Sequence, residues 1–279
     1  MKKICLLTTV LVLGLTMPAF ALKPFYDIPT KKTTFKTITY SYKDIKAKEE
    51  PYSYIKKDVS DTTLFIGSQD YSMADGNLCT ISMNGIKAET GDKVKLGAYY
   101  GRPTKAYRDF EYGKFWGVNT GTTLGKLSLA TGYDKFYKNI AALETADSYD
   151  ANNKGVWSAA AKYTFDSGSL SATLMNADGS APEGTTNNGV VLAYTLKGAD
   201  QTKPGSWGLW GKYYNQGYGT IVAPPINCSY SSNGFLGWGT GVNYAAGKNI
   251  ILGLEYYNLR GKTDATDYRT WRTSFTLTF

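Results

Sequence analysis

Residues 268–279 read Tyr-Arg-Thr-Trp-Arg-Thr-Ser-Phe-Thr-Leu-Thr-Phe, and this stretch decides the fold. Successive side chains of a β-strand point to opposite faces of the sheet, so alternating chemistry separates onto two faces. Two sets result here, one apolar (Trp271, Phe275, Leu277, Phe279) and one polar (Thr270, Arg272, Ser274, Thr276, Thr278). The stretch therefore predicts a strand with one apolar face and one polar face.

The same alternation recurs toward the N-terminus in about eleven further stretches. They are 249–259, 234–246, 206–215, 188–197, 168–176, 155–165, 126–137, 112–123, 93–101, 78–89 and 62–71. Tight turns such as 166–168 alternate with long connections such as 138–154 and 216–233. Outer-membrane barrels have short periplasmic turns and long outer loops. The pattern predicts an all-β fold, a closed antiparallel transmembrane β-barrel spanning residues 62–279.

The segment 22–61 adds a question about the number of strands. Residues 33–43 alternate as a strand does, and residues 51–58 could pair with them as one extra hairpin. The expected count is therefore 12 to 14 strands, with 14 slightly favoured, as about nine to eleven residues suffice for each spanning strand.

The first 21 residues have the order of a secretory signal peptide. Lys2 and Lys3 precede an apolar run at 4–15, and Ala19-Phe20-Ala21 fits a cleavage site. We expect the mature chain to begin at Leu22. No later stretch approaches the roughly 20 apolar residues of a membrane helix.

The composition limits the chemistry that is available. The chain has 0 histidines, which removes Ser-His and Cys-His catalysis and imidazole metal ligands, and no spacing marks another catalytic set. We expect no enzyme activity, no cofactor and no metal site. The basic residues form no dense block, so nucleic acid is not an expected partner. Whether Cys79 and Cys228 pair stays open, because distance in the fold decides it.

With the signal peptide, the Tyr- and Gly-rich alternating strands and the terminal Phe279 in view, the chain resembles small bacterial outer-membrane porins. In texture it resembles the barrel portion of the S-layer-homology porins of diderm Firmicutes, although we expect no such domain ahead of the barrel. The resemblance implies an outer-membrane location, lipid and lipopolysaccharide as surroundings, and the barrel assembly machinery as partner. It also implies that Phe275, Leu277 and Phe279 act as the assembly signal.

Strand parity separates the residues that face lipid from those that face the interior. Charged side chains on the lipid face would cost roughly 2–4 kcal/mol each for Lys or Arg at mid-membrane. The expected pore-lining residues are therefore Lys95, Lys162, Lys212, Glu255 and Arg272. A lumen with this excess of positive charge favours anions weakly.

The long connection 216–233 contains an apolar run that should not lie bare in water. We expect it to enter the barrel mouth, with Ile221, Pro224, Pro225 and Cys228 as candidates for a constriction loop.

Three functions remain open. The first is a porin that passes small hydrophilic solutes by diffusion, and a homo-oligomer is left open for it. The second is a closed structural or adhesin-type barrel without a pore. The third is a soluble secreted carbohydrate-binding β-sandwich, which would also be rich in aromatic residues.

Overall fold

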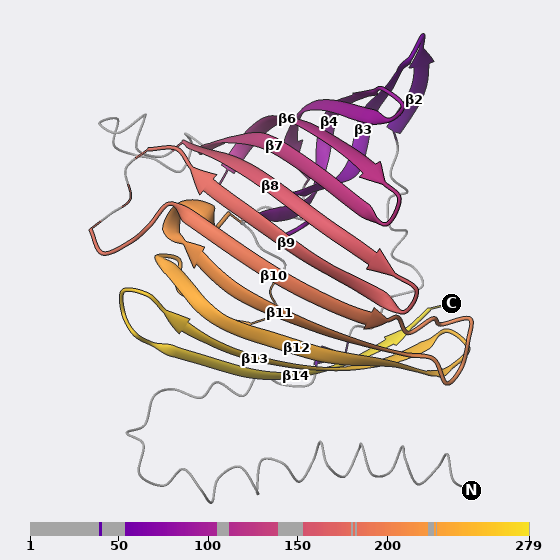
Figure 1. Cartoon of the computed structure of the whole chain (residues 1–279), viewed down its shortest axis with the longest axis vertical. Helices are drawn as coiled ribbons and strands as arrows, with labels where there is room; N and C mark the ends of the chain where they lie inside the picture. Colours follow the sequence, from indigo (N-terminus) through magenta and orange to yellow (C-terminus); the bar gives the residue numbers. More distant parts are fainter. Residues whose placement is uncertain are drawn as a thin grey trace, which may run out of the picture. The chain divides into compact units, whose positions relative to one another are not determined.

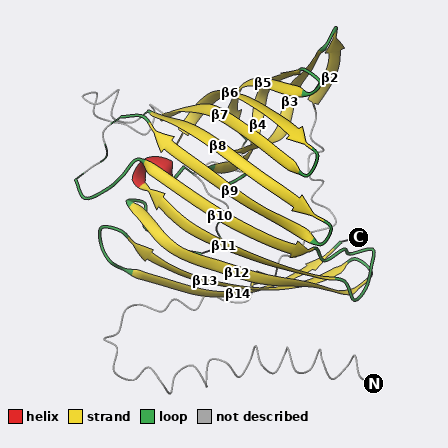
Figure 2. Ribbon diagram, in the orientation of Figure 1, coloured by secondary structure: helices red, strands yellow, loops and turns green. Residues whose placement is uncertain are grey.

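The computed structural model of the chain describes residues 39–40, 54–104, 112–138, 153–179, 181, 183–222, 226 and 228–278. Strands dominate these ranges, and the one helical element among them is a short 3-10 turn, η3, at Tyr218–Thr220. Figure 2 shows this turn in red beside the strands in yellow. No helix among the described residues is long and apolar enough to cross a membrane.

The strands run through the chain in order (Figure 1). Their bounds are β1 Thr39–Tyr40, β2 Tyr54–Val59, β3 Thr62–Met73, β4 Cys79–Thr90, β5 Val94–Pro103, β6 Tyr112–Leu124, β7 Leu127–Lys138, β8 Lys154–Phe165, β9 Gly168–Ala177, β10 Asn188–Lys197, β11 Trp207–Gly217, β12 Gly234–Gly247, β13 Ile250–Gly261 and β14 Asp267–Leu277.

All of these strands belong to one sheet. Strands β2 to β14 each pair antiparallel with the next strand in sequence, which gives thirteen antiparallel strands. The two-residue β1 pairs in parallel with β14, through Thr39–Ser274 and Tyr40–Phe275. The two edges of this 14-stranded order are β1 and β2, and no pairing of described residues joins β2 to β14. A β-sandwich needs two packed sheets, so the described strands do not form one.

The twelve strands expected between residues 62 and 279 are all confirmed, with ends that differ by at most two residues. Further toward the N-terminus, Tyr54–Val59 pairs with β3. Of the hairpin expected between 33–43 and 51–58, residues 39–40 and 54–58 are described. They do not pair with each other, because β1 pairs with β14 and β2 pairs with β3. The signal peptide also lies outside the described residues.

The two faces of the sheet differ as strand alternation requires. We call the face that carries the buried side chains the interior face and the other the outer face. Large apolar side chains remain exposed on the outer face of strands throughout the sheet, among them Leu96, Val118, Leu129, Leu174, Leu192, Trp207, Tyr213, Trp238, Trp271 and Phe275. A bilayer is the solvent in which such a face is stable.

Contacts between distant strands show that the sheet curls around its interior face. The turn between β3 and β4 bonds to β9 and β11, through Asn77 to Thr173 and Gln216 to Asn77. Figure 1 shows the same curvature.

The connections divide between the two ends of the sheet. The long-loop end carries 74–78, 104–111, 139–153, 178–187, 218–233 and 262–266; the short-turn end carries 60–61, 91–93, 125–126, 166–167, 198–206 and 248–249. Short and long connections therefore alternate, with 198–206 as the long exception at the short-turn end.

Candidate functional site

The interior face near the short-turn end is polar and built from small residues. Serine, threonine, alanine and glycine alternate there with the outer-face apolar residues, at Gly121, Thr123, Ser128, Ala130, Ala160, Ser169, Ser171 and Thr195. Several of these side chains, including Thr123, Ala130 and Thr195, are exposed although they point inward. This half of the interior is therefore open to solvent.

The five charged residues expected to line a pore all lie on the interior face by strand parity. Lys95 on β5 and Lys162 on β8 are exposed, and both lie in the small-residue half. Lys162 and Lys212 lie in one cross-strand row, with Ser171 and Ala193 between them. With neighbouring strands about 4.8 Å apart, that row places the two lysine backbones roughly 14 Å apart.

Glu255 and Arg272 are direct cross-strand partners on β13 and β14. Arg272 Nη1 lies 3.7 Å from Glu255 Oε2, so the carboxylate offsets the charge of the arginine. Tyr257 Oη also donates to Glu255 Oε2 at 3.4 Å. Of the five expected residues, Lys95 and Lys162 are therefore the exposed positive charges on this face.

The row of Glu255 continues to an aromatic residue. Trp210 on β11 pairs with Gly241 on β12, and Gly241 pairs with Glu255. The indole lies across β12, since a Cβ on Gly241 would lie 2.5 Å from Trp210 Nε1. Trp210 and Tyr257 approach with ring centroids 5.8 Å apart. The glycines of β12 therefore leave the space that these two rings occupy.

Sequence reasoning missed three further charged sites on the interior face. Lys87 Nζ lies 2.8 Å from Glu89 Oε1 on β4. Tyr99 donates its hydroxyl to the buried carboxylate of Asp134. Lys154 donates to two backbone carbonyls, those of Tyr218 and Ile221, at 3.1 and 3.0 Å. The alternation within the predicted strands 78–89, 93–101 and 126–137 already places Lys87, Tyr99 and Asp134 inward, so parity applied to every strand would have found them. Lys154 was assigned to the connection 138–154, and β8 begins one residue earlier than predicted.

Toward the long-loop end the interior face becomes apolar and fully packed. One cluster of buried side chains extends around most of the sheet. Its members include Tyr71, Met73, Ile81, Met83, Tyr99, Phe115, Phe136, Val156, Met175, Val191, Tyr214, Phe235 and Leu259. Several are wholly buried, such as Phe115, Phe136 and Phe235 at 0% exposure. This half of the interior is closed where the other half is open.

The turn between β3 and β4, residues 74–78, completes this packing, and we call it the plug turn. Leu78 is 0% exposed and Asn77 is 5% exposed. Asn77 Nδ2 donates to Thr173 Oγ1 of β9 at 2.8 Å, and Gln216 Nε2 of β11 lies 3.4 Å from the carbonyl oxygen of Asn77. The sequence pattern predicted this segment only as an ordinary turn.

Residues 218–222, which we call the strap, pack beside the plug turn. Ile221, an expected constriction residue, is buried in the cluster, and Cys228 packs against it. Thr220 Oγ1 donates to the carbonyl oxygen of Gly217, and Gln216 Nε2 donates to that of Thr220 at 3.1 Å. Pro224 and Pro225 lie outside the described residues. Cys79 and Cys228 both belong to this region, and each is a thiol in the structure.

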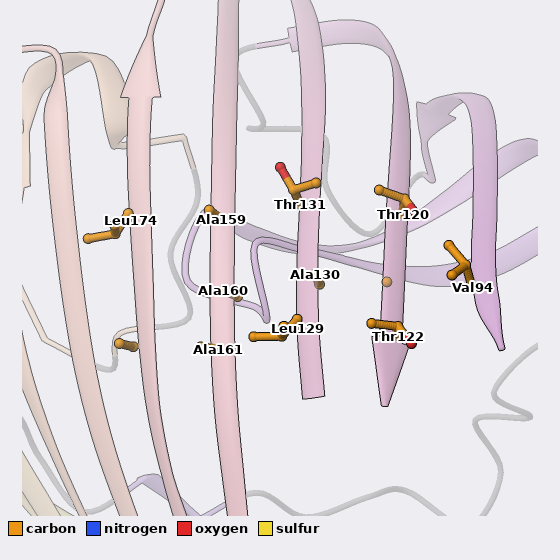
Figure 3. A pocket seen from close by; sticks show the side chains of 12 residues that line it. Val94, Thr120, Thr122, Leu129, Ala130, Thr131, Ala159, Ala160, Ala161 and Leu174 are labelled. Atoms are coloured by element: carbon orange, nitrogen blue, oxygen red, sulfur yellow. The ribbon is translucent and has the colours of Figure 1, made fainter. Parts of the chain in front are cut away.

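On the outer face, β5 to β9 form a shallow groove of about 420 Å³ (Figure 3). Its lining is Val94, Thr120, Thr122, Leu129, Thr131, Ala159, Ala161 and Leu174, together with Gly121, Ala130, Ala160 and Ala172.

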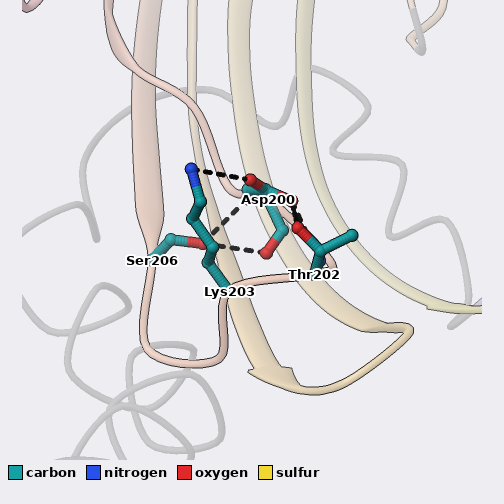
Figure 4. Close-up of polar contacts among 4 residues, drawn as sticks. All are labelled: Asp200, Thr202, Lys203 and Ser206. Atoms are coloured by element: carbon teal, nitrogen blue, oxygen red, sulfur yellow. Dashed lines mark hydrogen bonds and ion pairs between the residues drawn. The ribbon is translucent and has the colours of Figure 1, made fainter.

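The connection 198–206 is ordered by its own polar contacts (Figure 4). The Asp200 carboxylate accepts from the backbone N–H and the hydroxyl of Thr202 at 2.9 and 2.6 Å, and Lys203 Nζ lies 3.4 Å from it. The Thr202 hydroxyl is the largest cause that lowers the pKa of Asp200 below its ordinary value. These contacts stabilise the long connection at this end of the sheet.

The same connection and the β12–β13 turn together hold Thr278, the residue after β14. Thr278 N–H donates to the Asn249 carbonyl at 3.0 Å, and Thr278 Oγ1 donates to Gln201 Oε1 at 3.0 Å. Of the expected assembly-signal residues, Phe275 is exposed on the outer face and Leu277 lies on that face too. Phe279 lies outside the described residues.

No group of His, Cys, Asp and Glu able to hold a metal ion occurs in the described ranges. No family model matches the chain, and no curated protein matches it. Among solved structures, a mutant of Rh. blastica porin is 12% identical, with a TM-score of 0.44 over 80% of this chain and 75% of that one. OmpT of Vibrio cholerae, expressed in the outer membrane, is 15% identical, with a TM-score of 0.45 over 77% and 73%.

Proposed function

We propose that the chain is an outer-membrane porin whose interior passes small hydrophilic solutes, with a weak preference for anions. The observation that supports this most is the opposite chemistry of the two faces of one sheet. The outer face exposes leucine and aromatic side chains, and the interior face near the short-turn end exposes lysine, threonine and alanine side chains. A transmembrane barrel with a water-filled lumen has this arrangement.

The sign of the selectivity rests on the lysines of the interior face. Lys95 and Lys162 are exposed, whereas Arg272 is offset by the carboxylate of Glu255. A positive wall raises the local concentration of anions, and salt screens this effect over about 10 Å at 0.1 M. The preference should therefore be weak and should fade at high salt.

Reversal potentials in a planar bilayer under a salt gradient test this proposal. Replacing Lys95 and Lys162 with Glu should move the selectivity toward cations, because the charge of the open half of the interior changes sign. Lys248→Glu is the matched control, because Lys248 lies in an exposed turn outside the interior face. Cation preference in the wild-type channel, or an equal shift in the control, would contradict the assignment.

A second candidate function is a closed structural or adhesin-type barrel. The packed apolar cluster at the long-loop end favours it, because a filled interior leaves solutes no continuous path. Insertion without conductance under every condition would support this candidate over the porin.

A further inference from the structure

The interior face changes chemistry halfway along the strands. On the short-turn side Lys95, Lys162, Thr123 and Thr195 are exposed to solvent. On the long-loop side the plug turn, the strap and the apolar cluster fill the space. The solvent-exposed half of the interior therefore ends at the packed half, and solutes have no open path to the long-loop end.

The plug turn is attached to the hairpin in a way that lets it move as a unit. The β3–β4 pairing ends at Met73 and Cys79, and residues 74–78 lie beyond this last pair. Moving the turn out of the interior would therefore break no strand pairing. The movement would separate Leu78 from the apolar cluster and break the hydrogen bonds that join Asn77 to Thr173 and Gln216.

The packed arrangement also leaves buried polar atoms without a partner among the described residues. Close to the plug turn, the buried Gln216 Oε1 has no hydrogen-bond partner within the described part of the chain, and neither has the buried Gln69 Nε2 on β3. A buried polar network that is only partly satisfied is less stable than a complete one.

We propose that the plug turn is the gate of the channel, and that solutes cross the interior only when residues 74–78 leave their seat between β9 and β11. The strap, held to Lys154 through the carbonyls of Tyr218 and Ile221, forms the fixed side of this seat. The gate rests on the proposed porin function, since it regulates the same interior.

Single-channel recording in planar bilayers tests the gate with a shortened hairpin. Replacing residues 74–78 with Asn-Gly would close the β3–β4 pair Met73–Cys79 by a two-residue turn, a connection that suits antiparallel strands. The wild-type protein should be mostly closed, and the shortened protein should be continuously open. The control replaces residues 262–266 of the β13–β14 connection with Asn-Gly, and it should stay closed like the wild type.

A point variant tests the same gate with less disturbance. Asn77→Ala removes the bond to Thr173 and should raise the open fraction about fivefold, the effect expected from losing one buried hydrogen bond. Asn176→Ala is the matched control. Asn176 lies on β9, the strand of Thr173, but its amide bonds to Asn188 on the outer face.

The outcomes separate the gate from the porin function. Insertion of each protein is verified by heat-modifiable electrophoretic mobility. Equal open fractions in the wild type, the shortened hairpin and Asn77→Ala would overturn the gate and leave the porin function intact. If the inserted shortened protein does not conduct either, the porin function fails, and the gate fails with it.

Discussion

Gly239 and Gly241 allow two aromatic rings to lie flat on the interior face. A Cβ on Gly239 would lie 2.6 Å from Tyr257 Cδ1, and one on Gly241 would lie 2.5 Å from Trp210 Nε1. Real Cβ atoms essentially never approach so closely, so any larger residue would displace a ring. The alternation of glycine with Trp238, Thr240 and Val242 is visible in the sequence, but the rings that cover the glycines come from neighbouring strands.

Gly241→Ala tests this packing. We expect it to lower the free energy of unfolding by about 1–3 kcal/mol, the usual cost of overfilling a packed site, because the indole of Trp210 has to leave its position. The measurement is urea unfolding of the protein in lipid vesicles. Gly211→Ala is the control, since a Cβ there would meet no heavy atom within 4 Å. Equal stability of the two variants would show that the indole does not depend on Gly241.

The β3–β4 hairpin shows which features of the fold strand alternation can predict and which it cannot. Both strands were predicted within two residues, because the period-2 pattern is local and can be read from each strand alone. The role of the plug turn was not predicted. Its sequence, Ala74-Asp-Gly-Asn77, has ordinary turn residues, and the seat on Thr173 lies on a strand almost a hundred residues away, which no local pattern shows.

The interior charges show the same division between local and distant information. Parity alone placed Lys95, Lys162 and Lys212 on the interior face, since it requires only the strand and its register. The pairing of Glu255 with Arg272 depends on how β13 and β14 align, and this follows from the length of the loop between them. Sequence reasoning therefore identified the charges but not which of them offset one another.

Strand β14 allows the expected assembly signal to be tested apart from folded-state packing. Deleting Phe279 should reduce the yield of the membrane-inserted, heat-modifiable form if Phe279 acts in assembly, as the resemblance to porins implies. The contacts of Thr278 with Asn249 and Gln201 remain in that variant. Gln201→Ala, which removes a contact of Thr278 and keeps Phe279, should insert normally. Normal insertion after deletion of Phe279 would contradict the assignment.

At the scale of the whole molecule, a porin requires that its outer face meet lipid on every side. Adjacent residues of β10 provide a direct test, because Leu192 is exposed on the outer face and Ala193 points to the interior between Ser171 and Lys212. A lysine on the lipid face costs about 2–4 kcal/mol near mid-membrane, whereas a lysine in a hydrated lumen costs much less.

Leu192→Lys should therefore lower the free energy of unfolding in lipid vesicles by about 2–4 kcal/mol, and Ala193→Lys should leave most of it intact. The free energies come from reversible urea titrations followed by tryptophan fluorescence. The two variants carry the same new charge one residue apart. Repulsion from Lys212, the cross-strand partner of Ala193, acts against the expected order, so a smaller loss for Ala193→Lys reports the solvated face. If Ala193→Lys were the more damaging change, the interior would be dry at this level, and the closed structural barrel would explain the protein better than the porin.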